Sequence, residues 1–237
     1  MAHGSGQVTP AGLNAAISLL FVAGSACFVV GSFPGYLDAV GGTADGVTFF
    51  VGSVFFTTAS ASQLLQAQTP ALASASADTQ HRSARPRWWA WLPGDKAWVA
   101  AVTQFPGTLF FNVSTFAALA HNATVEFEDQ HVWRPDVFGS TLFLVSSWYG
   151  VLAVRGIAAR SGDRLPAGIA WLNMLGSVLF MWSAIAAYVL PDGQDLNSGA
   201  AVAGTLLGAA CFLVGAALMF PAWHRAVHHT ALQGETT

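Results

Sequence analysis

Charged side chains are the scarcest feature of this sequence. Asp, Glu, Lys and Arg make up 9% of its 237 residues, whereas 54% of the residues are hydrophobic. A soluble domain usually carries about 25% charged residues, because charge keeps its surface in water. This shortage excludes an ordinary soluble domain and predicts an integral membrane protein. The formal net charge of −3 is small, its sign matters less than where the charges sit, and nucleic acid is not expected as a partner.

Catalytic and cofactor signatures are missing as well. The sequence contains no Gly-x-Ser-x-Gly element, P-loop or dinucleotide-binding fingerprint, and its two cysteines lie singly inside apolar runs. A soluble type of enzyme and a secreted disulfide scaffold are therefore not expected, and no cofactor is predicted. The first ten residues contain no Lys or Arg, so the first apolar run is not predicted to be a cleaved signal peptide.

Apolar runs long enough to cross a bilayer occur six times, given that a spanning helix needs about 20 such residues. The runs are Leu13–Phe33, Gly46–Gln66, Ala97–Leu119, Asp136–Val154, Gly168–Leu190 and Gly199–Trp223. Their predicted ends are marked by Pro34, Pro135, Pro166, Pro191 and Pro221. The expected fold class is an all-α membrane protein of six transmembrane helices.

Basic residues are distributed unevenly between alternate loops. One side receives Arg82, Arg85, Arg87, Lys96, Arg155, Arg160, Arg164 and Arg225. The other side receives Arg134 alone, together with Asp38, Asp45, Glu126, Glu128, Asp129, Asp192 and Asp195. Because loops rich in Lys and Arg stay in the cytoplasm, both termini are predicted to be cytoplasmic. Anionic lipid is the expected partner at that face of the bilayer.

One motif recurs in every predicted span: a glycine, a small residue directly after it, and a phenylalanine four positions after the glycine. The glycines are Gly24, Gly52, Gly107, Gly139, Gly176 and Gly208, followed by Phe28, Phe56, Phe111, Phe143, Phe180 and Phe212. Lipid gives helices no hydrophobic drive to associate, so small residues that allow close approach indicate a packing seam. Each Phe is predicted to lie over the Gly of the antiparallel neighbour.

The spans are predicted to pair into three hairpins of the same orientation, with 28, 32 and 32 residues separating the paired glycines. Such a parallel repeat differs from the inverted halves of many transporters. The expected segments are a tail (1–12), a first hairpin (13–66), a cytoplasmic linker with an interfacial Trp and Arg segment (67–96), a middle hairpin (97–157), a last hairpin (166–223) and a tail (224–237).

These helix pairs carry a family resemblance. The Gly-Ser-x-x-Phe pairs in Leu20–Gln63 and Trp171–Met219 resemble the YrhK-like domain of small bacterial membrane proteins. The stretch Gln104–Ala118, QFPGTLFFNVSTFAA, resembles the middle hairpin of longer, six-helix relatives. The resemblance implies the hairpin fold and a bacterial plasma (inner) membrane, and it transfers no active residues.

Four amides inside the predicted spans are the candidates for an intramembrane binding site: Gln63, Gln104, Asn112 and Asn173. Gln104 and Asn173 each precede a motif glycine by three residues, so they are expected to face other helices. Two roles fit them, interhelical hydrogen bonding or a polar layer that lines a pore or small-molecule site. No ionisable residue stands near the middle of a predicted span, so a proton relay is not expected.

The outer loop supplies the candidates for a metal site: His121, Glu126, Glu128 and His131. Imidazole and carboxylate are metal ligands, and Glu126 and Glu128 would share a face if this stretch were extended. The spacing matches no known metal motif, and acidic outer loops follow from topology alone.

Three functions therefore stay open, in this order. The first is a membrane binding, sensing or assembly component whose helices mainly pack. The second is a channel or facilitator for a small neutral solute, and the third is a metal-assisted enzyme that uses the outer loop His121–His131. The order favours a protein that is not an enzyme. The expected partners are the lipid bilayer and, as an open alternative, a second copy of the chain.

Overall fold

The computed structural model describes residues 7–76, 78–120, 123–161 and 163–234. Within these ranges the regular elements are helices, accompanied by two isolated β-bridges. The long helices are α1 (Pro10–Gly31), α3 (Gly42–Gln68), α5 (Lys96–Ala117), α7 (Arg134–Ser161), α8 (Leu165–Ala186) and α9 (Ser198–Gly234). The short ones are α2 (Tyr36–Val40), α4 (Pro70–Ala73), α6 (Val125–Phe127) and the π-helical turn η1 (Glu128–Trp133). The all-α fold class is confirmed.

Capping residues explain where several helices begin. The Thr9 hydroxyl accepts a hydrogen bond from the Gly12 amide (3.1 Å), and Pro10 occupies the first turn, where it removes no helical hydrogen bond. The Asp95 carboxylate likewise accepts from the Ala97 amide (2.8 Å) at the start of α5. These local signals set the ends of the helices, while their packing follows from the interior residues.

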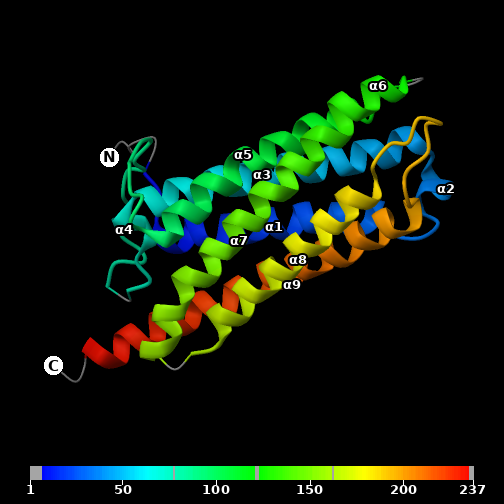
Figure 1. The fold of residues 1–237 in the computed structure, drawn as a ribbon. Helices are drawn as coiled ribbons and strands as arrows, with labels where there is room; N and C mark the ends of the chain where they lie inside the picture. The colour runs from blue at the N-terminus through cyan, green and yellow to red at the C-terminus, as the bar shows by residue number, and fades with distance from the viewer. Residues whose placement is uncertain (1–6, 77, 121–122, 162, 235–237) are drawn as a thin grey trace.

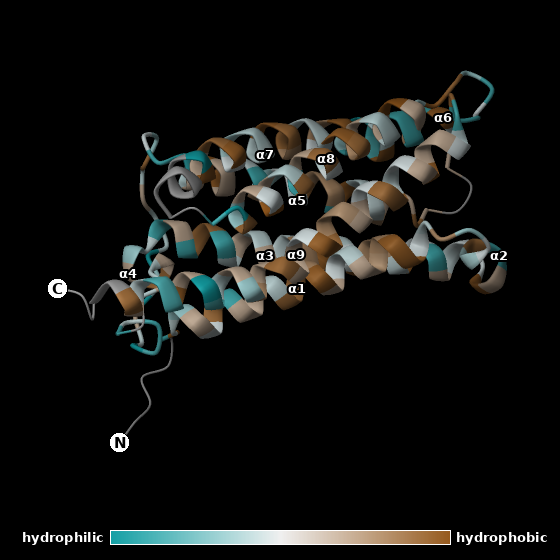
Figure 2. Ribbon diagram, turned by 90° about the horizontal axis from the view of Figure 1, so that it is seen from below, coloured by the Kyte–Doolittle hydropathy of each residue, from teal (hydrophilic) through white to brown (hydrophobic). Residues whose placement is uncertain are grey.

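Five stretches are long and apolar enough to cross a membrane: α1, α3, the continuous run Val125–Arg155 that leads into α7, α8, and α9 up to Leu232. Figure 2 shows hydrophilic residues gathered at the two ends of the bundle. The sixth long helix, α5, has 22 residues but includes polar residues such as Gln104 and Asn112. The fold is therefore that of an all-α integral membrane protein with five spans that meet the criterion of length and apolarity.

The six long helices form a closed ring. Each one packs against its neighbours along the chain, and α9 packs against α1 to close the circle. Helix α1 begins and α9 ends at one end of the bundle, which we call the terminus end (Figure 1). The opposite end, the loop end, carries α2, α6 and the connection between α8 and α9. The strongest packing is within the pairs α1 with α3, α5 with α7, and α8 with α9.

The motif glycines lie where the two helices of a pair come closest. A Cβ atom added to Gly24 would be 2.9 Å from the Phe56 ring and 3.0 Å from the Gly52 carbonyl oxygen. The six contacts are Gly24 with Phe56, Gly52 with Phe28, Gly107 with Phe143, Gly139 with Phe111, Gly176 with Phe212 and Gly208 with Phe180. The predicted packing of Phe over the Gly of the antiparallel neighbour is thus confirmed in all three pairs.

The six motif phenylalanines meet in the middle of the ring, where each is 7% exposed or less. Three of them, Phe56, Phe143 and Phe212, contact one another, with ring centroids 5.8, 6.1 and 6.3 Å apart. We call this triplet the terminus-side layer. Helices α3, α7 and α9 run toward the terminus end, and on each of them the Phe follows the motif Gly by four residues, so these three rings lie closer to that end than their glycines do.

The other three rings form the loop-side layer. Phe180 contacts both Phe28 and Phe111, with centroids 5.9 Å apart in each case. Contacts within the pairs, at 5.1–5.7 Å, join this layer to the terminus-side layer. All of these contacts are edge-to-face except that of Phe28 with Phe180, which is tilted, and aromatic quadrupoles favour such arrangements over a face-to-face stack. The two layers together occupy the middle of the ring and are called the phenylalanine plug below.

Two prolines do not end helices as predicted. Helix α9 continues through Pro221 to Gly234, and η1 runs into α7 through Pro135. A proline removes one N–H and bends a helix, yet neighbouring helices can satisfy the freed carbonyl in a membrane bundle. The segment after residue 223, predicted to be a tail, is therefore helical as far as Gly234.

Candidate functional site

A cavity of about 180 Å³ lies between the phenylalanine plug and the terminus end. The terminus-side layer forms its floor, and its walls include Gln63 on α3, Gln104 on α5 and Asn173 on α8. Three of the four amides proposed from the sequence therefore line one space, and each comes from a different helix pair. We call this space the amide cavity.

The three amides differ in their hydrogen bonding. The Ser146 hydroxyl on α7 lies 3.2 Å from Gln104 Oε1 and 2.9 Å from the Ala100 carbonyl, so it can donate to either. Gln63 Oε1 is buried and has no hydrogen-bond partner among the described residues. Asn173 Oδ1 packs against Gly215, where an added Cβ would be 2.9 Å away. Of the three, Gln104 alone forms an interhelical bond in the described structure.

Hydroxyl groups form most of the interhelical hydrogen bonds. Ser147 and Ser177 join α7 to α8 at 2.7 Å, and Ser53 and Thr115 join α3 to α5 at 2.9 Å. The Ser183 hydroxyl donates to the Ala201 carbonyl at 2.6 Å and so joins α8 to α9. Sequence reasoning assigned this role to the amides. The available signal was the small residue that follows the motif glycine by one position, as Ser53 and Ser177 do, or by seven, as Ser183 does.

A second space lies on the opposite side of the plug. It has a volume of about 140 Å³ and is walled by the loop-side layer together with Thr115, Asp136, Ser183 and Thr205. We call it the outer pocket. A further pocket of about 250 Å³ at the loop end also includes Asp136, together with Glu128 and Asp195. The plug therefore separates two polar spaces that lie at different levels of the same ring.

Asp136, the first residue of the fourth predicted span, is the ionisable residue that the structure places in the walls of both the outer pocket and the pocket at the loop end. The helix that carries it begins at Val125, eleven residues earlier. That added length contains Glu126, Glu128, Asp129 and Arg134, so Asp136 lies at the edge of the apolar stretch and not near its middle. An early start of this helix was hard to foresee, because the preceding residues are acidic and end in Pro135.

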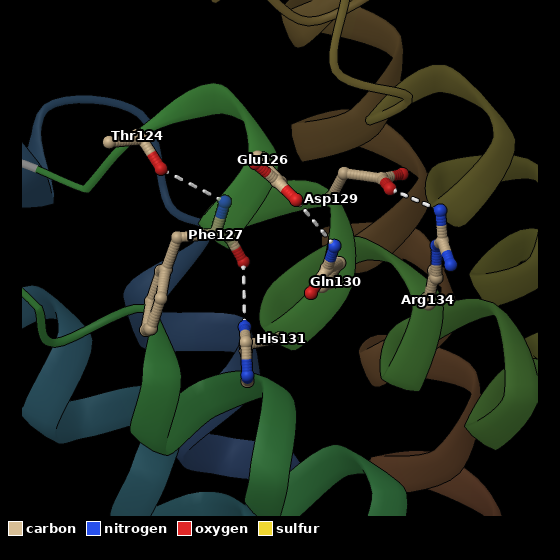
Figure 3. Close-up of polar contacts among 7 residues, drawn as sticks. All are labelled: Thr124, Glu126, Phe127, Asp129, Gln130, His131 and Arg134. Carbon is tan, nitrogen blue, oxygen red and sulfur yellow. Dashed lines mark hydrogen bonds and ion pairs between the residues drawn. The ribbon is translucent and has the colours of Figure 1, made fainter.

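The predicted metal ligands that the structure describes form no metal-binding group, and Figure 3 shows Glu126 and His131 each bonded within their own stretch of helix. The stretch from Val125 onward is helical, so the hypothesis that Glu126 and Glu128 share an extended face is wrong. Glu126 instead accepts a hydrogen bond from Gln130 (3.0 Å). His131 stacks on Phe127 with centroids 4.5 Å apart, and its Nδ1 lies 3.2 Å from the carbonyl of the same residue.

Two other candidates lie elsewhere. His121 falls outside the described residues. Asn112 has a buried Oδ1 without a hydrogen-bond partner in the described structure, but it lines neither the amide cavity nor the outer pocket. Among the described residues, no group of three His, Cys, Asp or Glu side chains is placed to hold a metal ion.

Comparison with known proteins returned no matching family model, no matching characterised protein and no matching solved structure. The resemblance to the YrhK-like domain stays a prediction.

Proposed function

We propose that this chain is a six-span membrane protein with cytoplasmic termini, and that its amide cavity binds a small neutral polar molecule. Such a protein would serve as a membrane binding or sensing component. The observation that carries the proposal is the convergence of Gln63, Gln104 and Asn173, one from each helix pair, on a single cavity. The bacterial plasma membrane, implied by the YrhK-like resemblance, is the proposed location.

The polar residues of α5 are compatible with a sixth span because of the direction in which they point. Gln104 faces the amide cavity. After Lys96, which begins the helix, the exposed side chains of α5 are apolar and include Leu109, Phe110, Val113 and Phe116. A helix whose polar groups face the lumen presents only hydrocarbon to lipid, which is the requirement for crossing the bilayer.

The chemistry of the cavity indicates a neutral ligand. None of the residues that line it is ionisable, so a charged molecule would lose its hydration without gaining a counter-charge. Amides offer both N–H donors and carbonyl acceptors, and the apolar terminus-side layer forms a hydrophobic floor. A compact molecule with a polar head, such as an amide, urea or polyol, matches this combination.

Ligand binding is tested by thermal denaturation of the purified protein in detergent, titrated with urea, acetamide and glycerol at sub-denaturing concentrations. We expect a saturable rise in melting temperature with at least one of them, because a ligand that binds only the native state stabilises it. Asn173→Leu should weaken the apparent affinity about tenfold, the equivalent of one lost hydrogen bond.

The control is Asn112→Leu, which removes an amide outside the cavity and should leave the titration unchanged. A native protein that shows no saturable response to the three compounds would argue against the neutral-ligand proposal. An equal loss of apparent affinity in Asn173→Leu and Asn112→Leu would argue against the amide cavity as the binding site.

Topology is tested by labelling single cysteines with a membrane-impermeant maleimide in intact cells, after Cys27 and Cys211 have been replaced by alanine. We expect labelling of Asp192→Cys from outside and none of Ser74→Cys, because eight of the nine Lys and Arg residues lie on the predicted inner side. External labelling of Ser74→Cys would contradict cytoplasmic termini.

A facilitator for a small neutral solute is the second candidate function. It is favoured by the outer pocket, which places a second polar space beyond the plug. Passage from one space to the other would require the rings of the plug to move. The metal-assisted enzyme has no converging ligand set among the described residues to support it.

A further inference from the structure

The outer pocket holds a carboxylate that lacks a counter-charge. Asp136 forms no ion pair or hydrogen bond in the part of the chain that the structure describes. Arg134, the basic residue assigned to this end, pairs instead with Asp129 at 2.7 Å. The other ionisable groups nearby, Glu128 and Asp195 in the adjoining pocket, are acidic and add to the negative potential.

Three hydroxyl oxygens share the pocket with this carboxylate. Thr115 Oγ1 donates to the Phe111 carbonyl at 2.7 Å. Ser183 Oγ donates to the Ala201 carbonyl at 2.6 Å. Thr205 Oγ1 lies 2.7 Å from Ser183 Oγ and 3.1 Å from the same carbonyl, so its hydrogen is shared with one of these two acceptors. Since these acceptors take up the hydroxyl hydrogens, lone pairs remain on the oxygens that line the pocket.

The rest of the wall is uncharged. The loop-side layer, Phe28, Phe111 and Phe180, borders the pocket. The carboxylate and the hydroxyl oxygens are suited to a cation, and no basic side chain lines the pocket.

We propose that the outer pocket binds a small monovalent cation, either an alkali-metal ion or a compact alkylammonium, with Asp136 as its counter-charge. One carboxylate among neutral oxygens balances a single positive charge. A divalent ion generally needs more carboxylates than one, and no larger acidic group converges in the described structure. This inference concerns a different site and ligand from the amide cavity, and it stands without the neutral-ligand proposal.

The test is thermal denaturation in detergent, titrating NaCl, KCl or methylammonium chloride against N-methyl-D-glucamine chloride at constant ionic strength. We expect at least one cation to raise the melting temperature saturably, by roughly 5 °C at a hundredfold excess over Kd. Asp136→Asn, which keeps the shape and removes the charge, should abolish the rise. Asp38→Asn, at an exposed acidic position of the loop end, should respond like the native protein.

A second variant covers the case in which Asp136→Asn does not fold. Thr205→Val keeps the carboxylate and removes one hydroxyl oxygen, so the apparent affinity should fall about tenfold. A response to methylammonium alone assigns an organic ammonium, and a response to Na⁺ or K⁺ assigns an alkali-metal ion; both support the proposal.

Three results would overturn the cation site. They are a response retained in Asp136→Asn, the absence of a saturable response to the three cations in the native protein, and tighter binding of Mg²⁺ than of all three. The neutral solutes of the previous test are titrated in N-methyl-D-glucamine buffer, which contains none of the three cations. The response to neutral solutes then reports on the amide cavity alone, and the response to cations reports on the outer pocket alone.

Discussion

Gly208→Leu is expected to prevent α8 and α9 from packing, and so to give a protein that melts far below the native one or does not fold. An added Cβ at this position would lie 3.0 Å from the Gly176 carbonyl oxygen and closer still to the Phe180 ring. The backbone carbonyl belongs to a helix and cannot move aside. Overpacking typically costs about 1–3 kcal/mol, and contact with rigid backbone on one side and a plug ring on the other places this variant at the upper end.

Thermal denaturation in detergent measures the effect, with size-exclusion chromatography to report the folded fraction. Gly168→Leu is the matched control, since it makes the same substitution on α8 where no atom lies within 4 Å of an added Cβ. Melting temperatures that are equal in Gly208→Leu and Gly168→Leu would contradict the role of the motif glycines in close packing.

Phe143→Ala is expected to lower the free energy of unfolding by about 3–5 kcal/mol, the usual cost of removing a buried aromatic ring. Phe143 is 3% exposed and contacts Phe56, Phe111 and Phe212. Its loss leaves a void in the terminus-side layer, next to the amide cavity. Phe116→Ala on the outer side of α5, where the ring is 64% exposed, should cost far less.

The same variant separates the two candidate functions. If the protein is a facilitator, a thinner plug should raise the flux of urea or glycerol into proteoliposomes above that of the native protein and of Phe116→Ala. If it is a binding protein, the melting temperature should fall while the flux stays at the level of empty liposomes. A melting temperature that is equal in the two variants would contradict the plug as the packing centre of the bundle.

Much of the architecture was predictable because it depends on short-range rules. Helix length and apolarity follow from composition over about 20 residues, which a sequence displays directly. The Gly and Phe spacing predicted the packing of Gly24 against Phe56, because residues four apart share one helix face and small residues allow close approach. Both rules apply to every helix pair in the same way, so three repetitions made the pattern visible.

Predictions at the ends of the helices were less successful. Acidic residues and Pro135 favoured a loop after the third span, whereas α6, η1 and α7 form one helical run there. Pro221 was read as a helix end, although α9 continues past it. Such local signals are weak, and tertiary packing readily overrides them because neighbouring helices satisfy backbone groups that a proline leaves free.

The sequence by itself determined the all-α class, the membrane character and the Gly–Phe seams, since each depends on residues that are neighbours along one or two helices. Only the tertiary structure decided which seams face the same lumen. Closure of the ring by α9 against α1 turns six separate phenylalanines into a plug and brings Gln63, Gln104 and Asn173 to one cavity. It also places Asp136 beside Thr115, Ser183 and Thr205, which lie on three other helices and far apart in the chain. Helical periodicity predicts which side chains share a face of their own helix. The rotation and order of the helices around a lumen depend instead on the sum of all the contacts between them.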